Sequence, residues 1–137
     1  MKFNLNFYHP LKPETVELGV FPSDQIINQF EKIAWNDYLQ EVHAAKIDDI
    51  YHYPSLEIVH KESKKALVIS VVGDPGDYDF NISFKRPKIK KSLWGLNNQI
   101  NENYLTTINA QTNQDVLKCI QAFLSHDEDY LEKKVGI

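Results

Sequence analysis

Residues 77–84, with the sequence DYDFNISF, alternate strictly between polar and apolar side chains. The apolar members are Tyr78, Phe80, Ile82 and Phe84. A period of two is typical of a strand with one buried face, and such strands occur in antiparallel sheets whose other face meets water. We therefore expect a one-sided antiparallel sheet, with Asp79 and Asn81 in a polar row on its exposed face.

Four other segments have the pattern or length of strands, namely residues 3–7, 16–20, 56–60 and 66–72. The first two are separated by HPLKPE, whose prolines cannot donate to a ladder, which predicts a loop between two strands that could pair as a hairpin. The segments at 56–60 and 66–72 are joined by a short polar connection of hairpin length. Residues 66–72 have apolar side chains at both odd and even positions, so both faces of the strand are expected to be buried, which predicts a central strand.

A long helix is expected from Ser23, whose hydroxyl could cap its first turn. Its apolar stripe rotates partway along: Ile26 and Phe30 share one face, whereas Trp35 and Leu39 lie on another. The helix therefore kinks or restarts near Asn36, or its second half packs against something that the first half does not touch. That second surface could be a partner's.

A C-terminal helix is expected to begin after a cap at Thr112 or Asn113, with SHDED at 125–129 as a charged break. Residues 92–111 are harder to interpret and suggest a loop carrying Trp94, followed by a short strand or turn around YLTTI. With 137 residues the chain fits one domain, residues 1–137. The predicted fold is α+β: a mostly antiparallel sheet with a long helix and a C-terminal helix packed on one face.

Charge is distributed unevenly along the chain. The net charge is −4. Residues 85–91 contain five basic residues and no acidic one, whereas acidic residues outnumber basic ones in the rest of the chain. No local structural requirement explains these cations, so we expect them to bind a partner together with nearby polar side chains. The expected partner-binding residues are Lys85, Arg86, Lys88, Lys90, Lys91, Trp94, Asp79 and Asn81.

The acidic turn before the basic run has other possible readings. Asp77, Asp79 and Asn81 have the spacing that opens an EF-hand loop, but Ile82 stands where glycine is needed and Lys88 where a carboxylate is needed. The loop also lacks the Lys and Ser/Thr of a P-loop. A type II β-turn over residues 74–77, with proline second and glycine third, explains the composition better.

Catalytic and metal-binding motifs are weak. Five histidines, His9, His43, His52, His60 and His126, form no close pair at ligand spacing. The single cysteine, Cys119, lies at the edge of an apolar helix face and is expected to be a small buried thiol. We therefore expect no catalytic residue, metal or cofactor, although a site assembled by folding stays open.

Three functions remain as hypotheses. The first is a non-catalytic cytoplasmic module that binds another protein by charge complementarity, for example a bacterial immunity-type protein that neutralises a toxin. The second is a small enzyme or ligand binder with a pocket between sheet and helix, lined by Tyr78, Asp79, Asn81, Trp94 or His52. The third, less favoured, is nonspecific nucleic-acid binding through residues 85–91. No apolar run is long enough for a membrane span or a signal peptide, and the oligomeric state is open.

Overall fold

The computed structural model describes residues 1–91 and 98–136, and gives side-chain positions for these residues except 89–91, 98–100 and 102. The strands are β1 (Lys2–Tyr8), β2 (Val16–Pro22), β3 (Ser55–His60), β4 (Ala66–Asp74), β5 (Asp77–Lys91) and β6 (Asn98–Gln111). The helices are α1 (Ser23–Glu31), α2 (Trp35–Ala44), the short 3₁₀-helix η1 (Ile47–Asp49), α3 (Asn113–Leu124) and α4 (Glu128–Val135).

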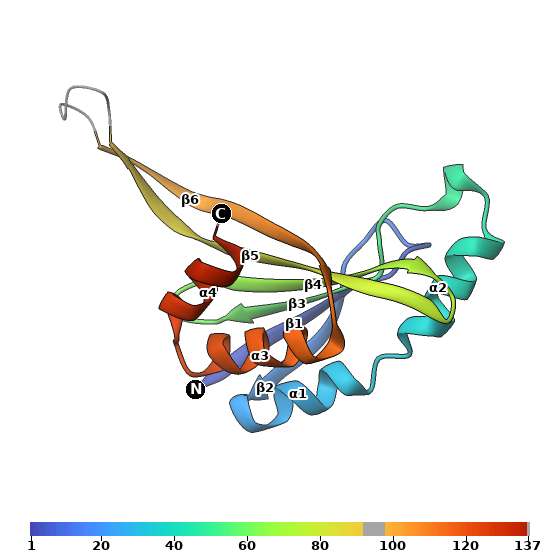
Figure 1. The fold of residues 1–137 in the computed structure, drawn as a ribbon, viewed down its shortest axis with the longest axis horizontal. Coiled ribbons are helices and arrows are strands. Elements are labelled where there is room, and N and C mark those ends of the chain that lie inside the picture. Colours follow the sequence, from blue (N-terminus) through green and yellow to red (C-terminus); the bar gives the residue numbers. More distant parts are fainter. Residues whose placement is uncertain (92–97, 137) are drawn as a thin grey trace.

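The strands form one antiparallel sheet in the order β2-β1-β3-β4-β5-β6. The predicted hairpin of β1 and β2 is present, with Phe3 opposite Phe21. β4 lies inside the sheet between β3 and β5, as its apolar sequence predicts. The α+β prediction is confirmed, since the helices lie against one face of this sheet (Figure 1).

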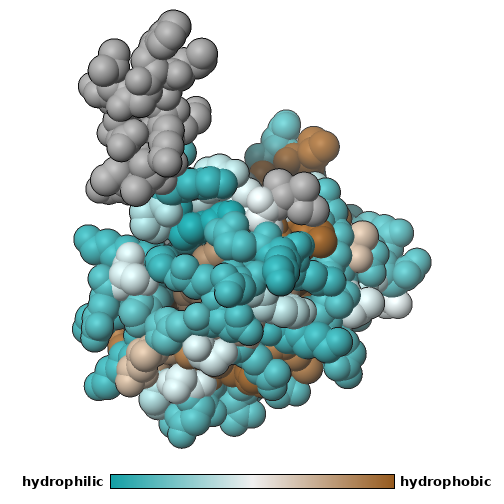
Figure 2. All heavy atoms as spheres, turned by 60° about the vertical axis from the view of Figure 1, so that its left-hand side comes forward, coloured by the Kyte–Doolittle hydropathy of each residue, from teal (hydrophilic) through white to brown (hydrophobic). Residues whose placement is uncertain are grey.

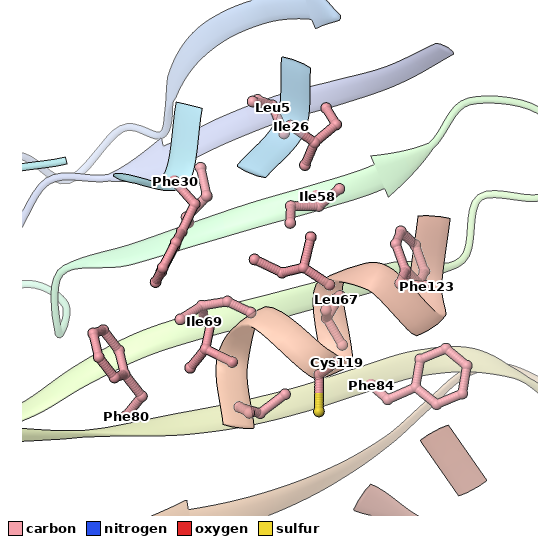
Figure 3. Packing of buried hydrophobic residues seen from close by; sticks show 14 of the residues in the cluster. Leu5, Ile26, Phe30, Ile58, Leu67, Ile69, Phe80, Phe84, Cys119 and Phe123 are labelled. Carbon is pink, nitrogen blue, oxygen red and sulfur yellow. The ribbon is translucent and has the colours of Figure 1, made fainter. Parts of the chain in front are cut away.

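The core fills the space between this helical layer and the sheet. Alternate residues of β1, β3, β4 and β5 point into it, and meet α1 and α3 from the other side (Figure 3). Fully buried members include Phe3, Leu5, Ile26, Leu56, Ile58, Leu67, Ile69, Ile82 and Ile120. The alternation in residues 77–84 is therefore correct: Phe80, Ile82 and Phe84 are buried on the helix side.

The predicted long helix is two helices, α1 and α2. The break lies at residues 32–34, slightly before the expected position near Asn36, and Ile33 N donates to Phe30 O there at 3.2 Å. The break lets Trp35 turn into the core, where its ring centroid lies 5.8 Å from that of Phe30 and 5.5 Å from that of Phe80. The expected cap by Ser23 is wrong, because α1 follows Pro22 and has no side-chain cap hydrogen bond.

The C-terminal helix is also divided. Thr112 caps α3 as predicted, in a reciprocal capping box with Asp115. The charged stretch after α3 ends the helix: His126 has a φ of +60°, and the Asp127 side chain then accepts from Tyr130 N at 3.2 Å to begin α4. Leu131 is buried again, so α4 returns to the same core.

The turn between β4 and β5 has the predicted backbone. Gly76 has a φ of +81°, the value that the third position of a type II turn requires. Gly73 has a φ of +134°, and a Cβ there would lie 2.8 Å from Asp77 O. The glycines of the acidic turn therefore serve backbone geometry.

The short strand or turn expected around YLTTI is a strand, but a longer one than predicted, since residues 98–111 form β6. Two register shifts between β5 and β6 interrupt the alternation that would have revealed it. Trp94 lies outside the described residues. Among these, no helix is long and apolar enough to cross a membrane.

Candidate interaction surface

The basic run lies on a two-stranded arm. β4 pairs with β5 only as far as Lys85, opposite Ala66, whereas β5 continues to Lys91 with β6 as its neighbour. We call the described strand ends beyond Arg86, residues 87–91 and 98–103, the arm. Figure 1 shows these strands leaving the body of the molecule, and Figure 2 shows a mainly hydrophilic surface around their base.

Arg86 is a structural residue, which the sequence did not reveal. It is 4% exposed, and its Nε and Nη2 donate to the two carboxylate oxygens of Glu132 at 2.7 and 2.8 Å. Its Nη1 donates to Phe84 O at 2.8 Å and to Thr106 Oγ1 at 2.6 Å. Because these contacts satisfy the buried guanidinium, Arg86 fastens α4 to β5 and is poorly placed to meet a partner.

Lys85 points to the opposite face of the sheet. Its Nζ lies 4.0 Å from Glu57 Oε2, and the other oxygen of Glu57 accepts from Asn6 Nδ2 at 3.0 Å. Asp79 and Asn81 lie on this same face, as expected, since they alternate with buried residues on β5. The described helices pack on the other side of the sheet (Figure 1). The residues of this open face, which alternate with the buried ones, are mostly polar.

The open face is partly dehydrated where Tyr8 contacts Glu57. Burial raises the pKa of the Tyr8 hydroxyl, and the negative charge of Glu57 raises it further. At the other end of the face Leu105, opposite Lys85 on β6, is 53% exposed. Leu105 is an exposed apolar residue that the sequence analysis did not single out, because it belongs to the segment for which only a short strand or turn was expected.

The remaining lysines of the basic run lie on the arm. Lys88 is exposed at the base of the arm, with its Nζ 4.6 Å from the centroid of the Tyr104 ring. Lys90 and Lys91 lie on β5 opposite Gln99 and Asn98. The structure therefore brings Lys85, Asp79 and Asn81 to one face and the other lysines to the arm.

The residues proposed for a ligand pocket do not converge. Tyr78 packs against Phe80 on the helix side, whereas Asp79 and Asn81 lie across the sheet from it. His52 stacks on Tyr8, with ring centroids 5.4 Å apart. The sheet separates Tyr78 from Asp79 and Asn81, and His52 contacts Tyr8 on the open face, so the described members of this set cannot line one cavity between sheet and helix.

A small cavity elsewhere brings two histidines together. It has a volume of about 10 Å³, enough for a single water. The His60 and His126 ring centroids are 5.1 Å apart, and His60 Nδ1 lies 2.6 Å from Ser63 Oγ. Within residues 1–91 and 98–136 no three His, Cys, Asp or Glu side chains are grouped to hold a metal.

Cys119 is buried, as predicted, at 0% exposure. Burial raises the pKa of its thiol to about 11, so very little of it is thiolate at neutral pH. A nucleophilic role for this cysteine is therefore disfavoured by its environment.

A second charged region was not predicted. Helix α2 docks onto the β4–β5 turn, where Gly76 N donates to Asn36 Oδ1 at 2.6 Å and His43 Nε2 lies 3.4 Å from Asp74 Oδ1. We call residues 34–50 and 72–79 the acidic end; they contain seven Asp or Glu residues and one lysine. The rotated apolar stripe of the helix was the available signal, since it indicated a separate packing surface for α2.

Comparison with known proteins gives no relative: no family model, curated protein or solved structure matches this chain.

Proposed function

We propose that this chain is a non-catalytic protein-binding module that recognises an acidic surface of another protein through the arm and its base. The observation that carries the proposal is the continuation of β5 and β6 beyond the end of β4, with Lys88, Lys90 and Lys91 on the continued part of β5. Residues 85–91 supply five positive charges, and the fold uses Arg86 in a buried ion pair. Exposed Leu105 beside Lys85 adds an apolar contact at the base.

An acidic protein fits this surface better than a nucleic acid does. Bidentate recognition of phosphates favours arginine, and the single arginine of this run is buried against Glu132. Outside residues 85–91 the chain has 10 basic and 19 acidic residues, which oppose the approach of a long polyanion. A compact acidic partner can meet the arm without facing the whole body.

A toxin-neutralising protein of the bacterial cytoplasm is the specific form of this proposal. Such a protein needs a rigid, charged surface that occupies an oppositely charged site, with no chemistry of its own. The arm supplies the charge, and the antiparallel sheet fixes its base. The buried, protonated Cys119 is compatible with a reducing compartment.

Site-specific photo-crosslinking in the native cell tests the proposal. A benzophenone amino acid replaces Leu105, which is exposed at the base of the arm, or Lys118, which is exposed on α3 and serves as the control position. We expect one acidic protein to crosslink at position 105 and not at position 118. Reversing the arm charges in Lys88→Glu/Lys90→Glu/Lys91→Glu should reduce the affinity of the purified pair by about tenfold or more.

The matched control reverses three exposed lysines elsewhere, in Lys12→Glu/Lys61→Glu/Lys118→Glu, and should retain binding. If position 105 crosslinked to nucleic acid and to no protein, the result would contradict protein binding by the arm and support nucleic-acid binding instead. Equal losses in the two triple variants would show that net charge, and not the arm, controls binding.

A further inference from the structure

The acidic end lies at the opposite end of β5 from the arm. β5 begins at Asp77, in the turn that α2 contacts, and reaches the arm at Lys91 after 15 residues. At about 3.3 Å per residue, the strand separates its two ends by about 46 Å. The two oppositely charged regions therefore cannot meet within one molecule (Figure 1).

The outward side of α2 is a shallow surface, widely open to solvent, which we call the groove. The open space over it is about 550 Å³. Its lining residues are Ala34, Asp37, Tyr38, Gln40, Glu41 and Ala44. Asp37 and Glu41 are four residues apart on one helix face, and the alanines at either end leave room beside them. A lysine side chain entering this groove would meet a carboxylate.

The chain that follows α2 presents large apolar side chains to solvent. Ile47 is 85% exposed, Tyr51 55% and Tyr53 62%. Tyr51 is attached to the loop between β1 and β2, because its backbone N donates to Pro10 O at 2.8 Å. Tyrosine is enriched among the residues that dominate interface energies.

A cationic strand is the ligand that suits this combination. Carboxylates pair with lysines, and exposed tyrosine rings attract ammonium groups through their faces. This chain contains such a strand in its own arm. We infer that the groove of α2 and residues 47–53 form the docking site for the arm of a second copy of this chain.

The resulting contact is head-to-tail, because the arm and the groove are different surfaces. Repeating it gives a closed ring if the rotation between copies closes, and an open chain if it does not. The inference rests on the proposed function, in which the arm is a binding element. It adds a second copy of this chain as a further acidic partner of the arm.

Analytical ultracentrifugation of the purified chain tests this inference. At an ionic strength of about 0.02 M we expect the weight-average mass to rise with protein concentration, and at about 0.5 M to return to that of a monomer, since salt screens the contact. The arm variant Lys88→Glu/Lys90→Glu/Lys91→Glu and the groove variant Asp37→Lys/Glu41→Lys should each be monomeric. An equimolar mixture of the two should associate, because every mismatched surface then has a complementary one.

The control variant Lys12→Glu/Lys61→Glu/Lys118→Glu should self-associate as the unmodified chain does. If the groove variant does not fold, Asp48→Lys/Asp49→Lys changes the adjoining η1 and should give the same result. A monomer at every concentration at low salt overturns the inference, as does association that the arm and groove variants leave unchanged. If the chain is monomeric but still crosslinks to an acidic protein at position 105, only self-association is overturned. If the chain is monomeric and no acidic protein crosslinks at position 105, both proposals are overturned.

Discussion

Arg86 shows how one residue can be misassigned from sequence. It belongs by position to a run of exposed lysines, yet its guanidinium is enclosed by Phe84, Thr106 and Glu132. Glu132 is 46 residues away in the sequence, so the residues next to Arg86 give no indication that it forms this ion pair. The burial of Cys119 could be predicted because the helix containing it has a clear apolar face.

Removing the partner of Arg86 should reveal its structural role. In Glu132→Ala the buried guanidinium loses two hydrogen bonds, and we expect the free energy of unfolding to fall by about 2 kcal/mol. This is less than the cost of breaking a fully buried pair, about 3–5 kcal/mol, because the side chain of Glu132 is 44% exposed and water can partly replace it. Urea denaturation measures the change.

The control for this prediction is Glu128→Ala on the same helix. Glu128 pairs with Lys65, whose side chain is 29% exposed whereas that of Arg86 is 5% exposed. Lys65 therefore stays hydrated when its partner is removed, and the loss should cost about 0.5 kcal/mol. Equal destabilisation of the two variants would contradict the structural assignment of Arg86.

The elements were predictable where their period was uninterrupted. β1, β2 and the first half of β5 follow from alternation. β3 and β4 follow from two apolar segments joined by a connection of hairpin length, and α3 follows from its cap and apolar face. The length of β6 was missed because two register shifts change which side its residues face. The divided helices were partly predictable, since the rotated stripe and the SHDED segment each indicated a break without fixing its residue.

The capping box of α3 gives a prediction about pH. Hydrogen bonds from the Thr112 amide and hydroxyl hold the pKa of Asp115 below its usual range. A carboxyl group whose pKa is lower in the folded state stabilises the fold above its unfolded pKa of about 4, and this stabilisation is lost as pH falls through the folded value. Asp115→Asn should therefore differ most from the unmodified protein near neutral pH, and the difference should shrink below about pH 4.

Unfolding by urea at several pH values measures this dependence. Thr112→Ala removes the hydroxyl and should cost about 1 kcal/mol at neutral pH. Gln114→Ala, an exposed neutral change in the same turn, should give a difference that does not vary with pH. A pH-independent difference for Asp115→Asn would contradict the role of its charge.

For the molecule as a whole, sequence predicted the α+β class but not the distribution of charge in space. The basic run was visible as five cations in seven residues. The acidic end was not, because its carboxylates come from α2, η1 and the β4–β5 turn and meet only when α2 docks. Contacts between distant segments depend on the packing of α2, which a local pattern does not specify.

The arm should be separable from folding. The described core contains no residue between 87 and 103, and Arg86 is paired with Tyr104 across the ladder. Replacing residues 87–103 with Asn-Gly, a favoured two-residue hairpin turn, should therefore change the free energy of unfolding by less than about 1 kcal/mol.

Thermal and urea denaturation of this shortened chain measure that change, and the crosslink at position 105 should weaken in the same variant. A shortened chain that fails to fold would show that the arm belongs to the structural body. Retention of both folding and full partner affinity would instead remove the arm from the binding surface.

The projection of β5 also determines what an approaching molecule senses. From Lys85 to Lys91 the strand advances about 20 Å, whereas in physiological salt the field of a charge decays over about 8 Å. Salt therefore screens the negative charge of the body from a molecule that contacts the outer arm. It likewise screens the positive charge of the arm from a molecule that contacts α2. The net charge of −4 determines how the whole chain moves in an electric field. A molecule bound at the arm, or one bound at α2, would instead interact with the local charge of that region.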